Sequence, residues 1–528
     1  MEGNSHVPRA PVTARRAAAI VLDGSSMTPA LLRRIAGGEP VRLGRGVMER
    51  VMRAHAALLM SASRGQPIYG LTVGVGQNKD RTMLAAKGQL TPEMIDASRR
   101  FNADLIRSHC IGYGPDLDAQ TTRAVLTTRL NMLLVGGSGV QPEIIEAFVA
   151  FLNKGLIPSI PSGGSLGQGD ITILGHIGLA MMGEGEVYQA GPRKMAAAQA
   201  LRDAGIAPIS PFGKDALAIF SSNAYSAALA ALALTELAQL TRVSQLVFGL
   251  SLEALNGNVA PFLAEAIALR PFPGSVRAAT ALRTLLAGSY LWQVDAQRHL
   301  QDPLSFRTAV HLLGVLDDSQ ERLHQLLAIQ LNASDDNPGI TPDPGAMMGA
   351  VLPNANFDPR PWVIAFEEAA IVLAHHCSGS AQRIIRLNDP AFTGLQRFLG
   401  TEHAAHAFAA AEKPVIALAS ECRELAHPVS IDSSSCQGNI EDVSTNAPRV
   451  VQRVRRQIDH GFRLLGIEVM HAAQAIDLRR QFQPQLVLSP ATEQLYRALR
   501  AQIPMLTEDR PLSGDFASVA ELVKHYPR

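Results

Sequence analysis

The sequence is poor in cysteine and in net charge. Its 528 residues include four cysteines, which are scattered without the paired spacing of a disulfide framework. Such usage favours reduced thiols and predicts a cytoplasmic protein. The formal net charge is only +1, so the sequence predicts neither nucleic acid nor an anionic membrane surface as a partner. The four cysteines are Cys110, Cys377, Cys422 and Cys436.

The sequence also lacks a long uninterrupted apolar run. No such run reaches the length that spans a bilayer, so a membrane protein is not expected. The apolar residues after Arg16 are too few for the core of a signal peptide and lead into Asp23. We therefore expect residues 1–18 to be a disordered leader. A metal site is not expected either, because no carboxylate completes a known metal spacing with His403 and His406.

Apolar, helix-forming residues are abundant. Hydrophobic residues make up 47% of the chain and charged residues 18%, which provides for a buried core and for subunit interfaces. Residues 216–255 are rich in Ala and Leu and apolar on all sides, which predicts a nearly continuous buried helix. Similar long patterns recur, and together they predict a mainly α protein with an antiparallel bundle of long helices. These patterns lie at 276–297, 309–331, 361–386 and 446–477.

The patterns divide the chain into three expected parts after the leader. A loop-rich N-terminal lobe occupies residues 19–215, the bundle of long helices residues 216–484, and short helices residues 485–528. The lobe begins with a short strand near residue 20 and a helix that starts at Thr28-Pro29. Its further predicted elements are helices at 92–111, 118–135 and 141–154, and a hairpin at 188–194.

A Gly/Ser-rich loop that leads into an apolar helix is the most distinctive stretch of the sequence. It reads PSGGSLGQGD from Pro161 to Asp170, and Asp170 stands where the N-cap of the following helix is expected. The glycines let this backbone bend sharply and approach other groups closely. A phosphate-binding loop is excluded, because no Lys-Ser/Thr pair follows the glycines.

This stretch resembles the signature of the aromatic amino-acid ammonia-lyase family, which includes the histidine, phenylalanine and tyrosine lyases. The family's loop reads Gly-Ser-Val-Gly-Ala-Ser-Gly-Asp, ahead of a helix that ends in Gly-Glu-Gly-Glu-Val. Residues 164–170 and 183–187 match it, except that Gln168 alone replaces the family's Ala-Ser pair. In the family, Ala-Ser-Gly cyclises and dehydrates to the electrophilic group MIO. Because Gly167-Gln168-Gly169 contains no serine, we expect neither MIO nor another cofactor.

The resemblance extends over almost the whole chain and implies roles for single residues. Tyr69 opens YGLTVGVG, which resembles the family's Tyr-Gly-x-Asn-Thr-Gly-x-Gly loop, where the tyrosine is the base that removes a β-proton. Glu441 lies in a match to Gln-Glu-Asp, whose glutamate the family places near the substrate amine. Tyr69 and Glu441 are therefore the predicted catalytic residues.

Other matches imply substrate-binding residues. Ser108 and His109 resemble a Ser-His pair that faces the substrate side chain in histidine lyases, which predicts a polar or heteroaromatic substrate. Arg307 ends QDPLSFR, which resembles the family's Gln-Asp-x-Tyr-Ser-Leu-Arg, where the arginine binds the substrate carboxylate. A planar guanidinium suits that task. Asn337 and Phe357 lie in matches to Asp-Asn-Pro and Gly-Asn-Phe-His and complete this predicted set.

Two further positions near the expected site differ from the family. Leu304 replaces its second tyrosine and can neither donate nor accept a proton, and Ser221 replaces the asparagine beside the electrophile. Asn223 is two residues further on, which is too far round a continuous helix to take that place. We expect Asn223 to make N-terminal or interhelical hydrogen bonds instead.

These observations predict a diverged lyase-like enzyme that performs elimination or isomerisation on an α-amino acid or related carboxylate without standard MIO. A substrate with a better leaving group than ammonia would fit. Three alternatives remain: a non-catalytic subunit that binds a small carboxylate, a structural protein with an empty pocket, or a different imidazolone formed by Gly167-Gln168-Gly169. The resemblance also implies a homotetramer whose long helices form a central bundle and whose sites are assembled from several subunits.

Overall fold

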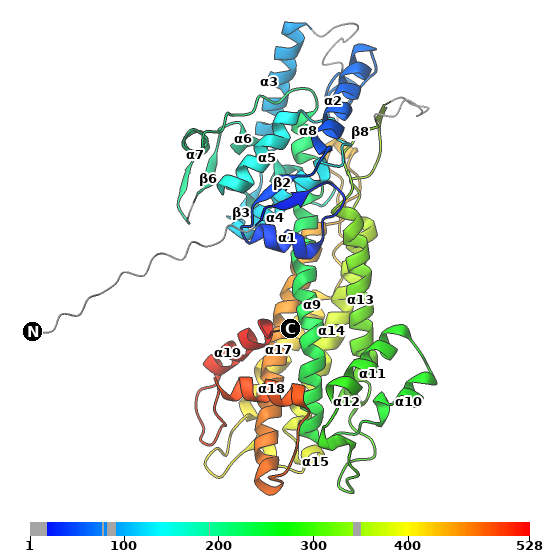
Figure 1. Cartoon of the computed structure of the whole chain (residues 1–528), viewed down its shortest axis with the longest axis vertical. Helices are drawn as coiled ribbons and strands as arrows, with labels where there is room; N and C mark the ends of the chain where they lie inside the picture. Colours follow the sequence, from blue (N-terminus) through cyan, green and yellow to red (C-terminus); the bar gives the residue numbers. More distant parts are fainter. Residues whose placement is uncertain (1–17, 77–78, 82–90, 190, 342–349, 528) are drawn as a thin grey trace, which may run out of the picture.

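A lobe of short strands and medium-length helices lies at one end of a bundle of long helices (Figure 1). The computed structural model describes residues 18–76, 79–81, 91–189, 191–341 and 350–527. The predicted leader, residues 1–18, lies outside the described residues except for Ala18. The mainly α fold with a long-helix bundle is confirmed.

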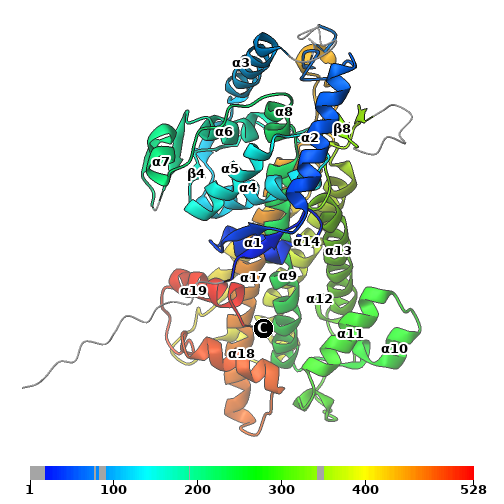
Figure 2. The same cartoon turned by 45° about the horizontal axis from the view of Figure 1, so that its top comes forward.

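The bundle consists of four long helices whose shared interior forms the core. They are α9 (Ala224–Leu255), α13 (Ala309–Gln330), α14 (Arg360–Leu387) and α17 (Ala447–Phe482). Helix α17 packs along α9 and α14, while α13 packs against α14 and α9 (Figures 1 and 2). Most side chains of α9 are buried on every side of the helix, as its Ala- and Leu-rich sequence predicts.

The lobe precedes α9 in the chain, and its helices start at local capping signals. Helix α1 (Pro29–Ala36) begins after Thr28, whose Oγ1 accepts a hydrogen bond from Leu31 N at 3.2 Å. The carboxylate of Asp118 accepts one from Thr121 N at 2.7 Å at the start of α4 (Ala119–Leu133). The strands of the lobe are β1 (Ile20–Leu22), β2 (Val41–Leu43), β3 (Tyr113–Asp116), β4 (Ile157–Pro158), β5 (Pro161–Gly163), β6 (Glu186–Tyr188) and β7 (Lys194–Ala196). Its helices are α1 (Pro29–Ala36), α2 (Val47–Ser63), α3 (Pro92–His109), α4 (Ala119–Leu133), α5 (Pro142–Lys154), α6 (Ile171–Met181), α7 (Ala197–Ala204) and α8 (Asp215–Phe220).

The strands form small separate sheets. β1 and β2 pair in parallel, with Ile20 opposite Val41. The other pairs are antiparallel: β3 with β5, β6 with both β4 and β7, and β8 (Gly339–Ile340) with β9 (Val351–Leu352). The pairing of β6 with β7 confirms the predicted hairpin.

Short elements surround the bundle. The strands are β8 (Gly339–Ile340) and β9 (Val351–Leu352). The α-helices are α10 (Ala264–Ala268), α11 (Pro273–Leu285), α12 (Leu304–Arg307), α15 (Pro390–Thr393), α16 (Glu412–Leu425), α18 (Pro490–Arg500) and α19 (Ser513–Lys524). Single turns of 3₁₀ helix are η2 (Ala260–Phe262), η3 (Tyr290–Trp292), η4 (Arg397–Leu399), η5 (Ala409–Ala411) and η6 (Gln437–Asn439).

One of the predicted helix ranges is wrong, and another is divided in two. The nearly continuous helix predicted at 216–255 is present as two helices, because α8 ends at Phe220 and α9 begins at Ala224. The predicted helix at 276–297 is shorter, since α11 ends at Leu285. The interruption between α8 and α9 lies beside the Gly/Ser-rich loop and shapes the candidate site.

One apolar stretch needs a test against membrane insertion. The stretch Asp215–Leu255 contains an 18-residue window with a mean hydropathy of 1.5, which is long and apolar enough to cross a bilayer by length and composition alone. Of that window, 94% is buried inside the protein. The stretch therefore serves as a core element, and one such helix is weak evidence for a membrane span.

Candidate active site

Helix α8 is a buried platform on which two of the predicted site segments pack. All six of its residues are buried. A Cβ on Gly70, where φ is +78°, would lie 2.2 Å from Leu217 Cδ1, so the loop that follows Tyr69 can approach α8 only with glycine there. At the end of α8, Phe220 stacks on the His109 ring, with centroids 4.8 Å apart and planes 16° apart. Helix α8 thus brings Tyr69 and His109 to one region.

The Tyr69 hydroxyl has a backbone donor and a carboxylate nearby. Its oxygen accepts a hydrogen bond from Gly76 N at 2.8 Å. Burial raises the pKa of Tyr69, the negative charge of Glu441 adds to this, and the hydrogen bond from Gly76 opposes it. The structure therefore places the two predicted catalytic side chains in one electrostatic environment.

Glu441 lies in a tight turn beside the Tyr69 loop. Cys436 N donates to Glu441 O at 2.9 Å, and Cys436 Sγ donates to Glu441 Oε2 at 3.3 Å. A Cβ on Gly76 would lie 3.7 Å from Gln437 Oε1, so this turn meets the loop that holds the Tyr69 hydroxyl. Sequence reasoning missed Cys436, because nothing in its spacing separates it from the other scattered cysteines.

The Gly/Ser-rich loop is held from within by Asp170. Ser165 Oγ donates to Asp170 Oδ1 at 2.5 Å, and Ser226 N donates to Asp170 Oδ2 at 2.8 Å. Burial raises the pKa of Asp170 to about 6, although these hydrogen bonds favour its charged form. Asp170 is the N-cap residue of α6 by position, but its side chain does not cap that helix as predicted. Its carboxylate instead joins the loop to the start of α9.

The loop is fixed again on both sides of Gln168. Gly169 N donates to Asn223 Oδ1 at 2.9 Å, and Asn223 Nδ2 donates to the Phe357 carbonyl. A Cβ on Gly167 would lie 2.6 Å from Ala447 N, so only glycine fits there. The predicted role for Asn223 is therefore wrong: the break before α9 turns its side chain toward the loop. Between these two fixed glycines, Gln168 Oε1 is buried and has no hydrogen-bond partner among the described residues.

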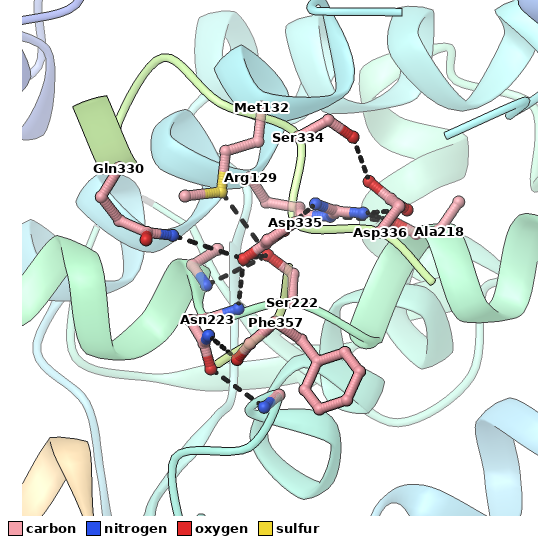
Figure 3. A network of polar contacts seen from close by, with 12 residues as sticks. Arg129, Met132, Ala218, Ser222, Asn223, Gln330, Ser334, Asp335, Asp336 and Phe357 are labelled. Carbon is pink, nitrogen blue, oxygen red and sulfur yellow. Dashed lines mark hydrogen bonds and ion pairs between the residues drawn. The ribbon is translucent and has the colours of Figure 1, made fainter. Parts of the chain in front are cut away.

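A buried ionic network holds the break between α8 and α9 (Figure 3). Arg129 lies 3.3 Å from Asp335 Oδ1 and 2.9 Å from Asp336 Oδ1, and its side chain is fully buried. Asp335 Oδ2 in turn accepts hydrogen bonds from Ser222 Oγ at 3.1 Å and Asn223 N at 2.8 Å. The ion pairs therefore position the residue that holds Gly169. Ser221, at the end of α8, sits beside this network and is half-buried.

One ring nitrogen of His109 is held by the backbone of α3. Its Nδ1 lies 2.7 Å from Leu105 O, and because a carbonyl only accepts, Nδ1 carries the proton and Nε2 is the acceptor in the neutral ring. Ser108 Oγ donates to the same carbonyl at 3.0 Å. The end of α3 can therefore offer an imidazole acceptor to a ligand.

Asn337 stands just before β8 in the chain, and Phe357 follows β9. Asn337 Oδ1 accepts a hydrogen bond from Asn354 N at 3.0 Å, which joins the residues before β8 to those after β9. Phe357 contributes its carbonyl to Asn223, and its ring points away from Asp335 (Figure 3). A hollow of about 630 Å³ beside it is lined in part by Asn356.

The predicted carboxylate-binding end lies far from these residues within one chain. Phe306 on α12 faces Phe248 of α9, with ring centroids 6.3 Å apart, whereas the loop contacts Ser226 at the other end of α9. At a rise of 1.5 Å per residue, Ser226 and Phe248 are about 33 Å apart along the helix. Both views show α12 away from the lobe (Figures 1 and 2). A single chain therefore does not bring Arg307 and Tyr69 together.

Arg307 is half-buried at the end of α12. Arg307 Nη1 donates to Gln301 Oε1 at 2.5 Å. Leu304 is 60% exposed on the same short helix.

Among the residues that the structure describes, no group of three or more His, Cys, Asp or Glu side chains is arranged to hold a metal ion.

Comparisons with known proteins cover nearly the whole chain. The sequence profile of the aromatic amino acid lyase family matches residues 27–501. Histidine ammonia-lyase of Geobacillus thermodenitrificans is 36% identical over 518 residues, which cover 96% of this chain and 97% of that one. Histidine ammonia-lyase of Chloroflexus aurantiacus is 34% identical over 513 residues, 96% of each chain.

Solved structures show the same likeness. The ergothioneine-degrading enzyme ergothionase of Treponema denticola, in complex with desmethyl-ergothioneine sulfonic acid, has a TM-score of 0.88 at 36% identity. The match covers 96% of this chain and 99% of that one. Histidine ammonia-lyase of Trypanosoma cruzi has a TM-score of 0.85 at 26% identity, over 96% and 93% of the two chains. These likenesses support an ammonia-lyase-type function, and the chain belongs to the aromatic amino acid lyase family.

Proposed function

We propose that this protein eliminates a tertiary amine from a histidine-like betaine, a substrate of the ergothioneine type, without an MIO group. The observation that carries the proposal is Gln168, the single residue between two fixed glycines where the family's loop has Ala-Ser. The likeness to ergothionase, an ergothioneine-degrading enzyme, supports the substrate class.

The residues present do not fit MIO. The group needs a serine hydroxyl that leaves as water, and the Gln168 side chain carries an amide instead. Ring closure also needs the Gly169 nitrogen to attack the Gly167 carbonyl. The Gly169 N–H instead donates to Asn223 Oδ1. We therefore assign no step of the reaction to MIO.

A quaternary ammonium substrate suits a site with a base and no electrophile. A primary ammonium offers N–H protons, and a nearby base removes these before the much less acidic β-proton. A trialkylammonium has no N–H, keeps its positive charge at every pH and leaves as a neutral amine. Elimination then transfers the β-proton to the base, forms the Cα=Cβ bond and breaks the Cα–N bond, with its electron pair going to nitrogen. No oxidant or co-substrate is needed.

Tyr69 is the proposed base in this elimination. As a phenolate it takes the β-proton, and Gly76 N already donates to its oxygen, so that donor stabilises the phenolate charge. Glu441, whose charge acts on Tyr69, is proposed to attract the cationic ammonium group. A positioned base typically contributes about 10²- to 10⁴-fold to the rate.

The other predicted residues are proposed to hold the two ends of the substrate. His109 Nε2 accepts a hydrogen bond from a ring N–H of the substrate, with Ser108 beside it, and Phe357, Asn337, Ser221 and Gln168 border the space. Arg307 binds the carboxylate as a bidentate partner. Because Arg307 and Tyr69 lie near opposite ends of α9 in one chain, the arginine of this site must come from another copy of the chain. This supports the proposed homotetramer with shared sites.

A comparison of three substrates distinguishes the requirement for the leaving group from the requirement for the ring. We expect trimethylamine to be released from ergothioneine and from histidine trimethylbetaine, which lacks only the sulfur, and no ammonia to be released from histidine. The amines are measured by chromatography and the unsaturated acids by ultraviolet absorbance. Ammonia release from histidine as the faster reaction would contradict the proposal. Binding of all three without release would favour the alternative of a non-catalytic carboxylate-binding subunit.

The intact mass tests the Gly167-Gln168-Gly169 loop directly. We expect the purified protein to have the mass of its unmodified sequence, because Gln168 offers no hydroxyl for dehydration. Electrospray mass spectrometry of the whole chain, with peptide mapping of residues 164–170, provides the measurement. A deficit of two waters in that peptide would show MIO-like dehydration, and a deficit of one would show simple cyclisation; either would overturn the proposed mechanism.

Replacement of Arg307 by alanine is expected to raise KM for the betaine about 10- to 100-fold, because hydrogen bonds to a charged carboxylate are lost. Steady-state amine release measures this. Arg307→Lys keeps the charge but not the planar pair of donors. Its KM should lie between the KM of the wild type and that of Arg307→Ala. The matched control is Arg322→Ala, which removes an arginine paired with Glu368 on the exposed bundle surface. An unchanged KM in Arg307→Ala would refute the carboxylate contact.

A mixing experiment tests whether the site is shared between copies. Tyr69→Phe and Arg307→Ala subunits, each impaired alone, are co-expressed with different tags and purified as mixed oligomers. Some sites then combine an intact Tyr69 from one copy with an intact Arg307 from another, so activity above that of either variant is expected. No gain in verified mixed oligomers would place both residues in one chain.

A further inference from the structure

We infer that Cys436 is a positioning residue whose thiol holds the Glu441 carboxylate toward Tyr69. Its effect on catalysis rests on the proposed function. The contact itself does not, and it can be tested separately.

The turn from Cys436 to Glu441 is closed at two points. The backbone bond from Cys436 N to Glu441 O is 2.9 Å long, and the side-chain bond from Cys436 Sγ to Glu441 Oε2 is 3.3 Å. Between them, Gln437 and Gly438 adopt positive φ values of 49° and 65°, which lets the chain reverse within so few residues. Backbone and side chain of Glu441 are therefore held by the same residue.

The thiol is suited to act as a donor in this place. Burial raises the pKa of Cys436, and the hydrogen bond to Glu441 and its charge raise it further, so the thiol stays protonated at neutral pH. A protonated thiol is a donor and a carboxylate an acceptor, so their chemistry matches. Among the described residues, Cys436 is the side chain that donates a hydrogen bond to the Glu441 carboxylate.

Packing does not account for the thiol. Cys377 and Cys422 are fully buried in an apolar cluster, as is usual for structural cysteines. Cys436 is only half-buried, and Ser433, Ser434 and Ser435 before it are exposed. The backbone bond would close the turn without the thiol. What the thiol adds is a fixed direction for a carboxylate whose charge acts on Tyr69.

The kinetic test compares three variants on a betaine substrate. Cys436→Ala is expected to lower kcat about tenfold with little change in KM, the loss expected when one hydrogen bond to a charged group is removed. Cys436→Ser keeps a donor and should restore most of kcat. Ser434→Ala, in the same exposed segment, is the control and should equal the wild type. Equal kcat in wild type and Cys436→Ala would overturn the inference.

A second measurement needs no enzyme activity. Glu441→Gln removes the negative charge that favours the protonated thiol, so alkylation of Cys436 by iodoacetamide at mildly alkaline pH should become several-fold faster. Peptide mass spectrometry follows Cys436, and Asp442→Asn, an exposed neighbouring carboxylate, is the control. Equal rates in Glu441→Gln and Asp442→Asn would overturn the inference. If the wild type releases no amine, the proposed function fails, and this comparison still decides the contact.

Discussion

Replacement of Tyr69 by phenylalanine is expected to lower amine elimination about 10²- to 10⁴-fold, the contribution of one positioned base. The change removes the single oxygen that accepts the β-proton and keeps the ring that packs beside α8. The Gly76 N–H, which donates to that oxygen, is left without its partner. The measurement is kcat for trimethylamine release from a betaine under saturating substrate.

The pH dependence gives an independent check on the same residue. Burial and Glu441 raise the pKa of Tyr69, so the phenolate is scarce at neutral pH and increases as pH rises. The wild-type rate should therefore rise with pH on the alkaline side, and Tyr69→Phe should lose this dependence. Tyr113, a 72% exposed residue, provides the control Tyr113→Phe, which should behave as the wild type. A Tyr69→Phe enzyme with more than a tenth of the wild-type rate would exclude Tyr69 as the base.

Replacement of Arg129 by methionine is expected to destabilise the protein by about 3–5 kcal/mol, the usual cost when one partner of a buried ion pair is removed. Asp335 and Asp336 would then lose the arginine that pairs with both of them in a dry interior. Among the described residues, Lys214 remains as a cation near them, 3.5 Å from Asp336 Oδ1. The midpoint of urea unfolding, followed by circular dichroism, measures the loss.

The control for Arg129→Met is the same substitution at an arginine whose ion pair is exposed to water. Arg34 pairs with Glu39 at 2.6 Å on the exposed surface, so Arg34→Met should leave the unfolding midpoint unchanged. Because Asp335 and Asn223 are hydrogen-bonded, Arg129→Met should also loosen the loop at Gly169 and lower elimination activity. Equal midpoints for the two variants would show that the buried network contributes little to stability.

Most helix boundaries could be predicted, because their signals are local. Thr28 before Pro29 and Pro142 at the start of α5 mark helix starts by side-chain capping and by fixed proline geometry. The long helices α13, α14 and α17 follow from apolar patterns in the sequence. Motifs likewise point to Tyr69, His109 and Glu441, which the structure gathers around α8 and the neighbouring turn.

The break between α8 and α9 could not be predicted with the same ease. Its sequence, Ser221-Ser222-Asn223, lies within an apolar, Ala-rich segment that favours helix. The contacts that stabilise the break come from Asp335, 112 residues away from Asn223 in the chain. Ser and Asn, which precede Ala224, are residue types that are favoured at helix N-caps. They are the local signal in this segment for a new helix start.

The distance between Tyr69 and Arg307 also lies beyond sequence motifs. A motif states what a side chain can bind, but it does not state which copy of the chain supplies it. The length of α9 keeps Tyr69 and Arg307 of one chain tens of ångströms apart, and this separation is a property of the fold that no short motif contains.

The tight fit of Gly167 limits how this loop can lengthen. Residues 164–170 are one residue shorter than the family's loop, so an insertion is needed to obtain the sequence Gly-Ala-Ser-Gly. The inserted residue would lie between Gly167, where a Cβ would lie 2.6 Å from Ala447 N, and Gly169, which is hydrogen-bonded to Asn223. Lengthening the loop would therefore disturb the starts of α17 and α9 together.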